Sequence, residues 1–334
     1  GIVDTETELL EHLDEIGIKD VDGYTSMDEV VKFGEKPDLA IIVTPIYTHH
    51  ILVQEAMDLG INVICEKNMA STIYQGKQMV QAAKDHPELC TAVGTQYRYF
   101  RRNWVARQFF AQKELPIGEL STIRLTNAWV WGEKRSGWRR WLPEVYLEDM
   151  ATHMFDLLRY TTGMDIVQVK ADAFIPKYSG WKGSSTVYAS FALCHPDDYN
   201  HRHNWVWCQY YGDWQPRGPV QGDGIHYYGG KGQARITDWG IDMKIYTDEY
   251  GSKFEEEGFL VEDAGSIEGL DDKLDGQSVI LEMMSRGINS KGKQQPGTHF
   301  AEAFKSFAVS QACIEASRTG ETIWVPDYWK GLID

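Results

Sequence analysis

The sequence predicts an α/β domain followed by an α+β domain: first a doubly wound parallel sheet, then a large, mostly antiparallel, open-faced sheet. In the first part, short apolar runs alternate with helical patterns about every 25 residues, as in parallel sheets with helices on both faces. From about residue 118, aromatic and β-branched runs follow one another with few helices between them, which indicates an antiparallel sheet. We expect the two domains to span residues 1–98 and 99–334.

The strands of the first part are apolar throughout, which suits burial on both faces of a sheet. The clearest is the run at 38–45, which turn residues bound, and the shorter run at 62–65 follows a helix that Gly60 ends. Residues 1–4 read as the end of another strand that enters a helix. The expected order is a strand end at 1–4, a helix at 6–16, a strand at 38–45, a helix at 49–59, a strand at 62–65, a helix at 73–84 and a strand at 91–94.

The second part is expected to be rich in strands, with one strong helix at 146–161 and another at about 298–318. The glycine-rich stretch at 212–233 is interpreted as a long irregular loop. The expected strands are 120–131, 167–175, 186–194, 205–211, 234–239 and 243–247, and a last apolar stretch is 323–325.

Charge and composition argue against several classes of protein. Asp and Glu number 49 against 33 Lys and Arg, which gives a net charge of −16, and an acidic surface repels phosphate backbones and anionic lipid. No apolar run approaches the roughly 18–20 residues of a membrane span. The five Cys are scattered and form no disulfide or metal pattern. We expect no nucleic-acid, membrane or metal partner and a cytoplasmic location, with a signal peptide upstream of Gly1 as the alternative.

Three polar residues of the helix expected at 146–161 share one face. Asp149, His153 and Asp156 have i, i+4 and i+7 spacing. A carboxylate one turn from a His can fix its tautomer and raise its basicity, which a general base requires. Lys67 follows the carboxyl end of a buried strand, where open α/β sheets bind their ligands. Taken alone, a structural His and a solvated Lys explain these residues better.

Four motifs in the same order and spacing resemble those of the Gfo/Idh/MocA family of NAD(P)-dependent oxidoreductases. They are Thr44-Pro45 with His49, Glu66-Lys67-Asn68 with Asn where Pro is usual, Gly94-Thr95-Gln96-Tyr97-Arg98, and Asp149 with His153 and Asp156 around Ala151, where Gly is usual. The resemblance implies a Rossmann-type dinucleotide-binding domain, followed by a substrate-binding sheet domain. It also implies an enzyme that transfers hydride between a sugar and NAD.

The resemblance places Lys67, His153 and Asp149 at the family's catalytic positions. His153 is expected to take the proton of a sugar hydroxyl while hydride leaves the same carbon for the nicotinamide. Lys67 is expected to stabilise the developing oxyanion, and Asp149 to orient His153 or bind a neighbouring hydroxyl. Asn68 cannot fix the backbone after Lys67 as Pro does, so a different direction of the Lys67 side chain is the alternative expectation.

The cofactor is expected to be NAD. Asp4, at a presumed strand end, suits a hydrogen bond from the ribose 2′-OH and would repel a 2′-phosphate, although a helix cap explains this Asp equally well. Adjacent His49 and His50 lack a further ligand at metal-binding spacing, so no metal is expected. The residues expected to contact the cofactor are Asp4, Thr44, Pro45, His49, Glu66, Lys67 and Gln96.

If Asp4 ends a second strand, then a first strand, its glycine-rich turn and a first helix are expected upstream of Gly1. Such a unit takes roughly 30 residues. Either these residues are missing from this chain, or the fold is an incomplete nucleotide-binding half.

A cluster of four Trp and three Arg at residues 129–141 precedes the expected helix of His153. Aromatic faces suit sugar rings or an aryl aglycone, and Arg suits hydroxyls or an acidic group; core packing explains Trp129 and Trp131 equally well. The substrate is expected to be a sugar or glycoside, oxidised at a ring hydroxyl, with C3 the position that the resemblance implies. The residues expected to bind it are Tyr97, Arg98, Trp138, Arg139, Arg140, Trp141, Asp149 and His153.

Two other functions would use the same residues: a non-catalytic regulator of the same fold that binds dinucleotide or sugar, and an NAD-dependent glycosidase with an internal redox cycle. The sheet of the second domain carries many Trp and Tyr on its outer face, too apolar to leave in water as one patch. We therefore expect a homo-oligomer that forms through this sheet.

Overall fold

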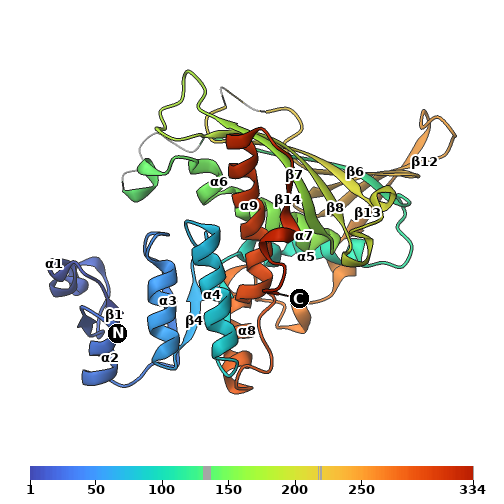
Figure 1. Cartoon of the computed structure of the whole chain (residues 1–334). Coiled ribbons are helices and arrows are strands. Elements are labelled where there is room, and N and C mark those ends of the chain that lie inside the picture. Colours follow the sequence, from blue (N-terminus) through green and yellow to red (C-terminus); the bar gives the residue numbers. More distant parts are fainter. Residues whose placement is uncertain (131–136, 217, 219, 334) are drawn as a thin grey trace.

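Three parallel strands form the centre of the first part of the chain (Figure 1). The computed structural model describes residues 1–130, 137–216, 218 and 220–333. The strands are β3 (Leu39–Ile42), β4 (Asn62–Cys65) and β5 (Thr91–Val93), in that order across the sheet. This sheet confirms the predicted parallel α/β architecture.

Helices cover both faces of this sheet, which is why β4 is apolar and buried along its length. Val63 and Cys65 pack against the core that includes α3 (His49–Asp58) and α4 (Ile73–Asp85). Ile64 points to the other face and packs against α8 (Gln277–Asn289), a helix from near the end of the chain.

A smaller unit lies beside α3 in Figure 1. Here β1 (Ile2–Val3) pairs in parallel with β2 (Gly23–Tyr24), and α1 (Thr7–Glu11) and α2 (Met27–Phe33) accompany them. The helix expected at 6–16 is shorter than predicted, because it gives way at His12 to a 3₁₀ turn at Leu13–Ile16.

The second part is built on a nine-stranded sheet in the order β13-β12-β11-β10-β6-β9-β8-β7-β14. All neighbouring strands are antiparallel except β6 and β9, which confirms the mostly antiparallel sheet. The strands are β6 (Leu120–Ala128), β7 (Asp165–Phe174), β8 (Thr186–Cys194), β9 (Val206–Asp213), β10 (Gly224–Gly229), β11 (Gly232–Thr237), β12 (Gly240–Tyr246), β13 (Phe254–Leu260) and β14 (Ile323–Trp324).

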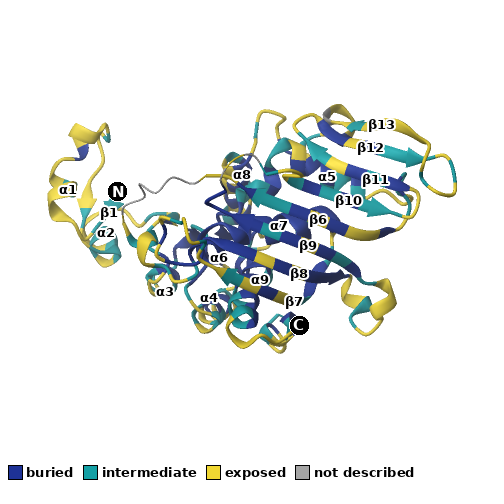
Figure 2. Cartoon of the chain, turned by 90° about the horizontal axis from the view of Figure 1, so that it is seen from above, coloured by how far each residue is buried: buried dark blue, intermediate teal, exposed yellow. Residues whose placement is uncertain are grey.

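Helices cover one face of the large sheet and leave the other open (Figure 2). α5 (Arg101–Phe110), α7 (Ala151–Thr162) and α9 (Phe300–Thr319) lie against the inner face. Phe191 and Tyr210 point to these helices and are fully buried, whereas Tyr188 points to the open face and is half exposed. The alternation along each strand is that of a sheet with one covered face.

Several elements differ from the sequence prediction. The helix expected at 146–161 is two helices, α6 (Val145–Asp149) and α7, that meet at Met150. The stretch 212–233 is not only loop, because β10 lies within it and buries Ile225 and Tyr227. Neither α5, α8 nor β13 was expected. Within the described part of the chain, no helix combines the length and apolarity needed to cross a membrane.

Candidate active site

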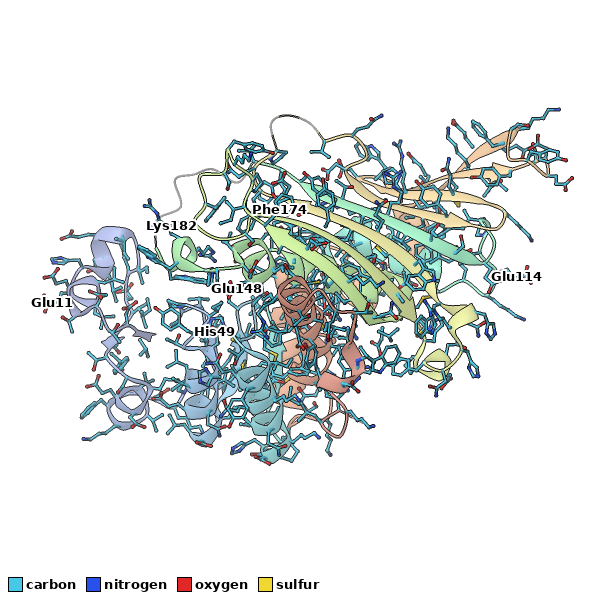
Figure 3. All side chains as sticks on the ribbon, turned by 45° about the horizontal axis from the view of Figure 1, so that its top comes forward. Glu11, His49, Glu114, Glu148, Phe174 and Lys182 are labelled. Carbon is cyan, nitrogen blue, oxygen red and sulfur yellow. The ribbon has the colours of Figure 1, made fainter. Side chains whose placement is uncertain are left out.

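A turn at the carboxyl end of β3 leads into α3, and His49 holds it in place. The turn contains Thr44 and Pro45, whose oxygens accept hydrogen bonds from Thr48 Oγ1. His49 is fully buried; its Nε2 lies 2.8 Å from the carbonyl oxygen of Thr44 and its Nδ1 lies 2.9 Å from that of Asn68 (Figure 3). One imidazole therefore joins the strand-end turns of β3 and β4.

The turn after β4 carries Glu66, Lys67 and Asn68. The Nδ2 of Asn68 donates to the carbonyl oxygen of Leu147 at 3.2 Å, which fixes this turn to α6. The peptide bond between Lys67 and Asn68 is cis. Asn68 stands where Pro is usual, and its side-chain amide contacts α6, the helix that ends at Asp149.

Lys67 and Arg139 both bind the carboxylate of Asp149, at the end of α6. Lys67 Nζ lies 2.5 Å from Asp149 Oδ1 and also donates to the Asp149 carbonyl oxygen at 2.7 Å. Arg139 Nε donates to the other carboxylate oxygen at 2.9 Å. Burial raises the pKa of Asp149, but the two cations and their hydrogen bonds outweigh burial and lower it. Asp149 is therefore an ionised anchor for Lys67.

His153, on the first turn of α7, is buried and stacks flat on Tyr97. The ring centroids are 4.0 Å apart and the planes differ by 7°. Burial lowers the pKa of His153 well below its ordinary value, the nearby charge of Lys67 lowers it further, and Asp149 offsets a part. His153 is therefore neutral at neutral pH, the form that accepts a proton.

Asp149 was expected to orient His153, but in the structure its carboxylate binds Lys67 and Arg139 instead. The break at Met150 puts Asp149 and His153 on separate helices, and both carboxylate oxygens of Asp149 face cations. His153 Nδ1 is buried and has no hydrogen-bond partner in the part of the chain that the structure describes. The orientation of the ring comes from its stacking on Tyr97 instead.

Buried polar atoms without partners gather at the strand ends near Lys67. Within the described residues they include Asn68 Oδ1, Thr95 Oγ1 and Gln96 Oε1. Buried polar groups are normally hydrogen-bonded, so atoms left without a partner mark a place where a polar ligand fits. They follow the carboxyl ends of β4 and β5, where open α/β sheets bind dinucleotides. The residues present therefore fit an NAD nicotinamide and ribose.

Glu66 lies across the same strand ends. Its carboxylate receives the backbone N–H of Lys67 at 3.1 Å and lies against Gly94, where an added Cβ would come within 3.0 Å of Oε1. Burial raises the pKa of Glu66, and the charge of Lys67 offsets a part of this effect. Asp4 lies after β1, and its carboxylate accepts the backbone N–H of Glu6 at 2.9 Å. Glu6, not Asp4, is the N-cap residue of α1, so the structure does not support the helix-cap alternative for Asp4.

The predicted substrate residues fall into two groups. Arg98 is buried and forms an ion pair with Asp156 while donating to the Gly297 carbonyl at 2.6 Å, so its guanidinium faces the protein interior. Trp138, Arg139, Arg140 and Trp141 form a 3₁₀ turn just before α6. There the Trp138 ring faces the Arg139 guanidinium at 4.5 Å, and the Trp141 ring faces Lys182 Nζ at 3.7 Å. Trp131 and Arg135 of this cluster lie outside the described residues.

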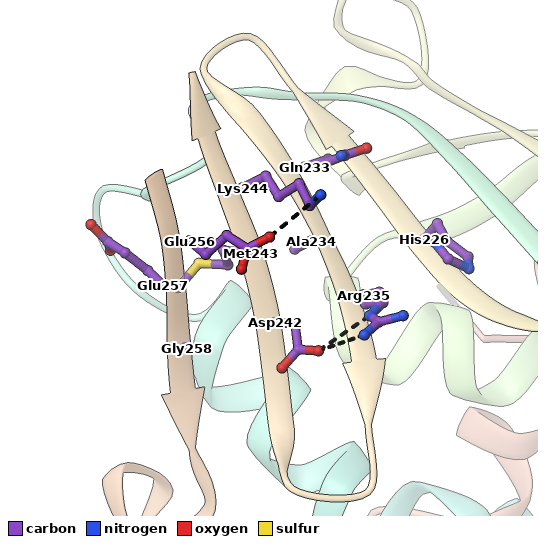
Figure 4. Close-up of a pocket in the computed structure, with 10 residues that line it drawn as sticks. All are labelled: His226, Gln233, Ala234, Arg235, Asp242, Met243, Lys244, Glu256, Glu257 and Gly258. Carbon is purple, nitrogen blue, oxygen red and sulfur yellow. Dashed lines mark hydrogen bonds and ion pairs between the residues drawn. The ribbon is translucent and has the colours of Figure 1, made fainter. Parts of the chain in front are cut away.

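Two hollows in the second domain differ in their relation to this centre. One, of about 770 Å³, includes Tyr97 and Met154 in its wall and so adjoins His153. The other, of about 580 Å³, lies on the open face of β10 to β13 (Figure 4). Its charged groups pair with each other, Arg235 with Asp242 at 2.9 Å and Lys244 with Glu256 at 3.5 Å. Only the first hollow belongs with the candidate active site.

The sequence did not reveal that Asn68, Thr95 and Asn103 belong to this centre. Asn103 fixes Tyr97, because its Nδ2 donates to the Tyr97 carbonyl at 2.7 Å. Asn68 and Thr95 lie inside the motifs, so the motifs could have indicated both residues. Asn103 lies outside the motifs, and no sequence pattern indicated it. Among the described residues, no group of three or more His, Cys, Asp or Glu is placed to hold a metal ion.

Comparisons with known proteins show what the chain is similar to. Residues 1–94 match the sequence model of the family described as "Oxidoreductase family, NAD-binding Rossmann fold". Levoglucosan dehydrogenase of Pseudarthrobacter phenanthrenivorans is 28% identical over 152 residues, 43% of this chain and 38% of that protein. Glucose-fructose oxidoreductase domain-containing protein 2 of Xenopus tropicalis is 28% identical over 160 residues, 45% of this chain and 40% of that protein. The chain thus spans about two fifths of the curated relatives it matches.

Solved structures show the same two-domain fold over nearly the whole chain. Levoglucosan dehydrogenase in complex with NADH and levoglucosan has a TM-score of 0.73 at 18% identity, over 97% of this chain and 89% of that chain. An oxidoreductase domain protein from Kribbella flavida has a TM-score of 0.75 at 17% identity, with the same coverage. Together with the family match, they confirm the resemblance to the Gfo/Idh/MocA family. The first 94 residues are therefore similar to the NAD-binding Rossmann domain of that family.

Proposed function

We propose that this protein is an NAD-dependent dehydrogenase that oxidises a ring hydroxyl of a sugar or glycoside, at C3, to a ketone. The observation that carries the proposal is a buried His153 on α7 that lies within electrostatic reach of Lys67, whose ammonium group is bound to Asp149. A cation to hold a developing alkoxide and a base to take the hydroxyl proton are the two groups that the oxidation needs. The levoglucosan dehydrogenase relative supports the substrate class.

Each residue of the centre has a separate task in this proposal. His153 accepts the proton of the reacting hydroxyl, and stacking on Tyr97 holds its ring in place. Lys67 stabilises the negative charge that grows on the oxygen, while Asp149 and Arg139 keep the ammonium group directed. NAD, when bound, would supply the hydride acceptor for the same carbon.

The residues that hold NAD in this proposal lie after successive strands of the parallel part. Thr44 and Pro45 follow β3, Glu66 and Lys67 follow β4, and Gln96 follows β5. Asp4 follows β1 and would receive a ribose hydroxyl. His49 is a positioning residue, since carbonyl oxygens occupy both sides of its buried ring.

The substrate residues in this proposal surround His153 on the side of the second domain. Tyr97 packs against His153 and Phe100 and lines the adjoining hollow, and the turn with Trp138, Arg140 and Trp141 lies next to Asp149 through the bond from Arg139. Arg98 is left out, because Asp156 and a carbonyl group already bind its guanidinium.

The test is absorbance of reduced nicotinamide after mixing the full-length protein with NAD and a panel of free sugars, sugar acids and aryl glycosides. A rise with one class supports the dehydrogenase and names its substrate. Release of aglycone without a net rise would point to the glycosidase with an internal redox cycle. Binding of NAD without any turnover would point to the non-catalytic regulator.

We also propose a homo-oligomer formed through the open face of the large sheet. Phe174 stacks on Tyr188 with ring centroids 6.0 Å apart, and Tyr188 stacks on Tyr211 at 4.8 Å (Figure 3 labels Phe174). This row of aromatic rings crosses three neighbouring strands on the open face. Burying it against a second copy would remove apolar surface from water.

A reducing compartment, the cytoplasm, remains our proposal for location. All five Cys are buried and free, and burial raises the pKa of Cys208 and Cys313, which keeps both thiols protonated. Free thiols are typical of proteins in reducing compartments.

A further inference from the structure

We propose that the site accepts a glycoside with two rings, and that the second ring lies in the cleft between Tyr97 and Trp239. This inference rests on the proposed function, because the first ring is the sugar that His153 and Lys67 oxidise. It narrows the proposed sugar or glycoside to a two-ring glycoside and adds a second binding position.

The cleft is linked to the reaction centre through Tyr97. Tyr97 uses one face to stack on His153 at 4.0 Å, and it also lines the cleft, as does Met154, the residue that follows His153 on α7. The hollow has a volume of about 770 Å³, within the range of roughly 300–1,000 Å³ of pockets that bury drug-sized ligands. A single sugar ring held at His153 would leave the outer part of this space to water.

Two elements from distant parts of the sequence form the outer end of the cleft. Arg102, on α5, forms an ion pair with Asp238, in the turn between β11 and β12, at 2.7 Å. Trp239 follows Asp238 in this turn, lines the cleft and is 78% exposed. The ion pair joins the turn that carries Trp239 to α5, and the indole ring lines the cleft that Tyr97 also lines.

The chemistry of the walls suits a second ring. An indole so exposed loses contact with water when a flat ring covers it, and aromatic faces bind the apolar face of a pyranose or an aryl group. Polar side chains also line the cleft, Asp223 and Asn127 among them, and these can form hydrogen bonds with ring hydroxyls. Trp138 and Trp141 are less suitable, because the cationic groups of Arg139 and Lys182 already face their rings.

The test compares one-ring and two-ring ligands by calorimetric titration of the full chain with saturating NAD. The ligands are glucose, galactose and glucuronic acid, each as the free sugar and as its phenyl glycoside. For at least one pair, we expect the phenyl glycoside to bind tenfold or more tightly than the free sugar. In Trp239→Ala this advantage should fall below threefold while the affinity for the free sugar stays the same. Tyr250→Ala is the matched control, because Tyr250 is 87% exposed outside the cleft and should keep the full advantage.

Equal affinity for both members of every pair, no binding of any phenyl glycoside, or an advantage that survives in Trp239→Ala would overturn the inference. Turnover in parallel reactions separates it from the proposed function. If the protein oxidises free sugars and glycosides equally well, the dehydrogenase stands and the two-ring site fails. If binding follows the expectation but no ligand is oxidised with NAD, the two-ring site stands and the dehydrogenase fails.

Discussion

The carboxylate of Asp149 lies between two cations, and this arrangement separates the charges of the centre. Lys67 and Arg139 hold Asp149 ionised, while His153, four residues beyond the end of α6, is buried and has no ionic partner among the described residues. The centre therefore holds a cation, Lys67, and a neutral base, His153, at the same time. This is the distribution that proton removal from a neutral hydroxyl requires.

The first prediction concerns the pH dependence of kcat/KM. His153 must be neutral to accept a proton, and burial together with Lys67 holds its pKa well below 6.5. Activity is lost as His153 gains a proton, so the acid limb of the profile should fall below pH 6.5, with no loss on this side between pH 6.5 and 8. Steady-state rates with the substrate from the sugar panel, at constant ionic strength, measure the profile. An acid limb centred at or above pH 6.5 would contradict the assignment of His153.

At the residue level, the sequence predicted the chemical groups better than their partners. Lys67 and His153 were predicted because each lies in a motif of fixed spacing, and both stay predictions for the reaction. The ion pairs of Asp149 with Lys67 and of Arg98 with Asp156 join residues 82 and 58 positions apart, and no local pattern records such contacts. Arg98 was therefore expected at the substrate although it is buried in an ion pair.

The element that ties the two parts of the molecule together is α9. It lies on the inner face of the large sheet, and Phe304 and Phe307 extend from it to Gly76 on α4. An added Cβ on Gly76 would come within 2.7 Å of Phe307 and 3.0 Å of Phe304. Both rings are fully buried, so this contact fixes α4 against α9 at close range.

Gly76→Ala should therefore destabilise the fold. Overpacking of a tight contact costs about 1–3 kcal/mol, and the better helix propensity of Ala restores a part of it, about 1 kcal/mol at most. Urea denaturation measures the free energy of unfolding. Gly230→Ala is the control, because nothing lies within 4 Å of its added Cβ, and it should change the free energy by less than about 0.5 kcal/mol. Equal stability of the two variants would show that α4 and α9 are not tightly packed.

Elements with regular apolar patterns were predicted within a few residues, and those without were missed. β8 was predicted with the bounds it has, because β-branched and aromatic residues fill it. β10 was missed because glycines surround it. β13 was missed because this edge strand carries three Glu in a row, which is not an apolar pattern. The interruption at Met150 could not be predicted, because helical periodicity continues across it.

At the scale of the whole molecule, the open face of the large sheet is the feature that remains without a covering layer. Figure 2 shows this face with exposed and intermediate residues along the strands that α5, α7 and α9 cover from behind. The aromatic row across β7, β8 and β9 lies on it. The sequence predicted an aromatic outer face from composition and alternation, but a sequence does not show which rings lie in one row.

Tyr188→Glu should weaken self-association, because it places a charge in the centre of this row, where Tyr188 is 52% exposed. The wild-type protein should give an oligomeric mass in light scattering after size exclusion, and the variant should give a smaller one. Tyr74→Glu, a change at an exposed Tyr of α4, should keep the wild-type mass. A monomeric wild type would contradict the proposed interface.

The proposed oxidation of a sugar hydroxyl depends on His153 acting in the chemical step rather than in the binding of NAD. The most direct measurement compares wild type, His153→Ala and the exposed-lysine control Lys84→Met in two assays, NAD affinity by calorimetry and oxidation of the panel substrate by absorbance. We predict that His153→Ala loses about 10²–10⁴-fold in kcat, as for a positioned proton acceptor, while its NAD affinity and both properties of Lys84→Met stay near wild type. Undiminished turnover in His153→Ala, or a loss of turnover matched by an equal loss of NAD affinity, would contradict the account.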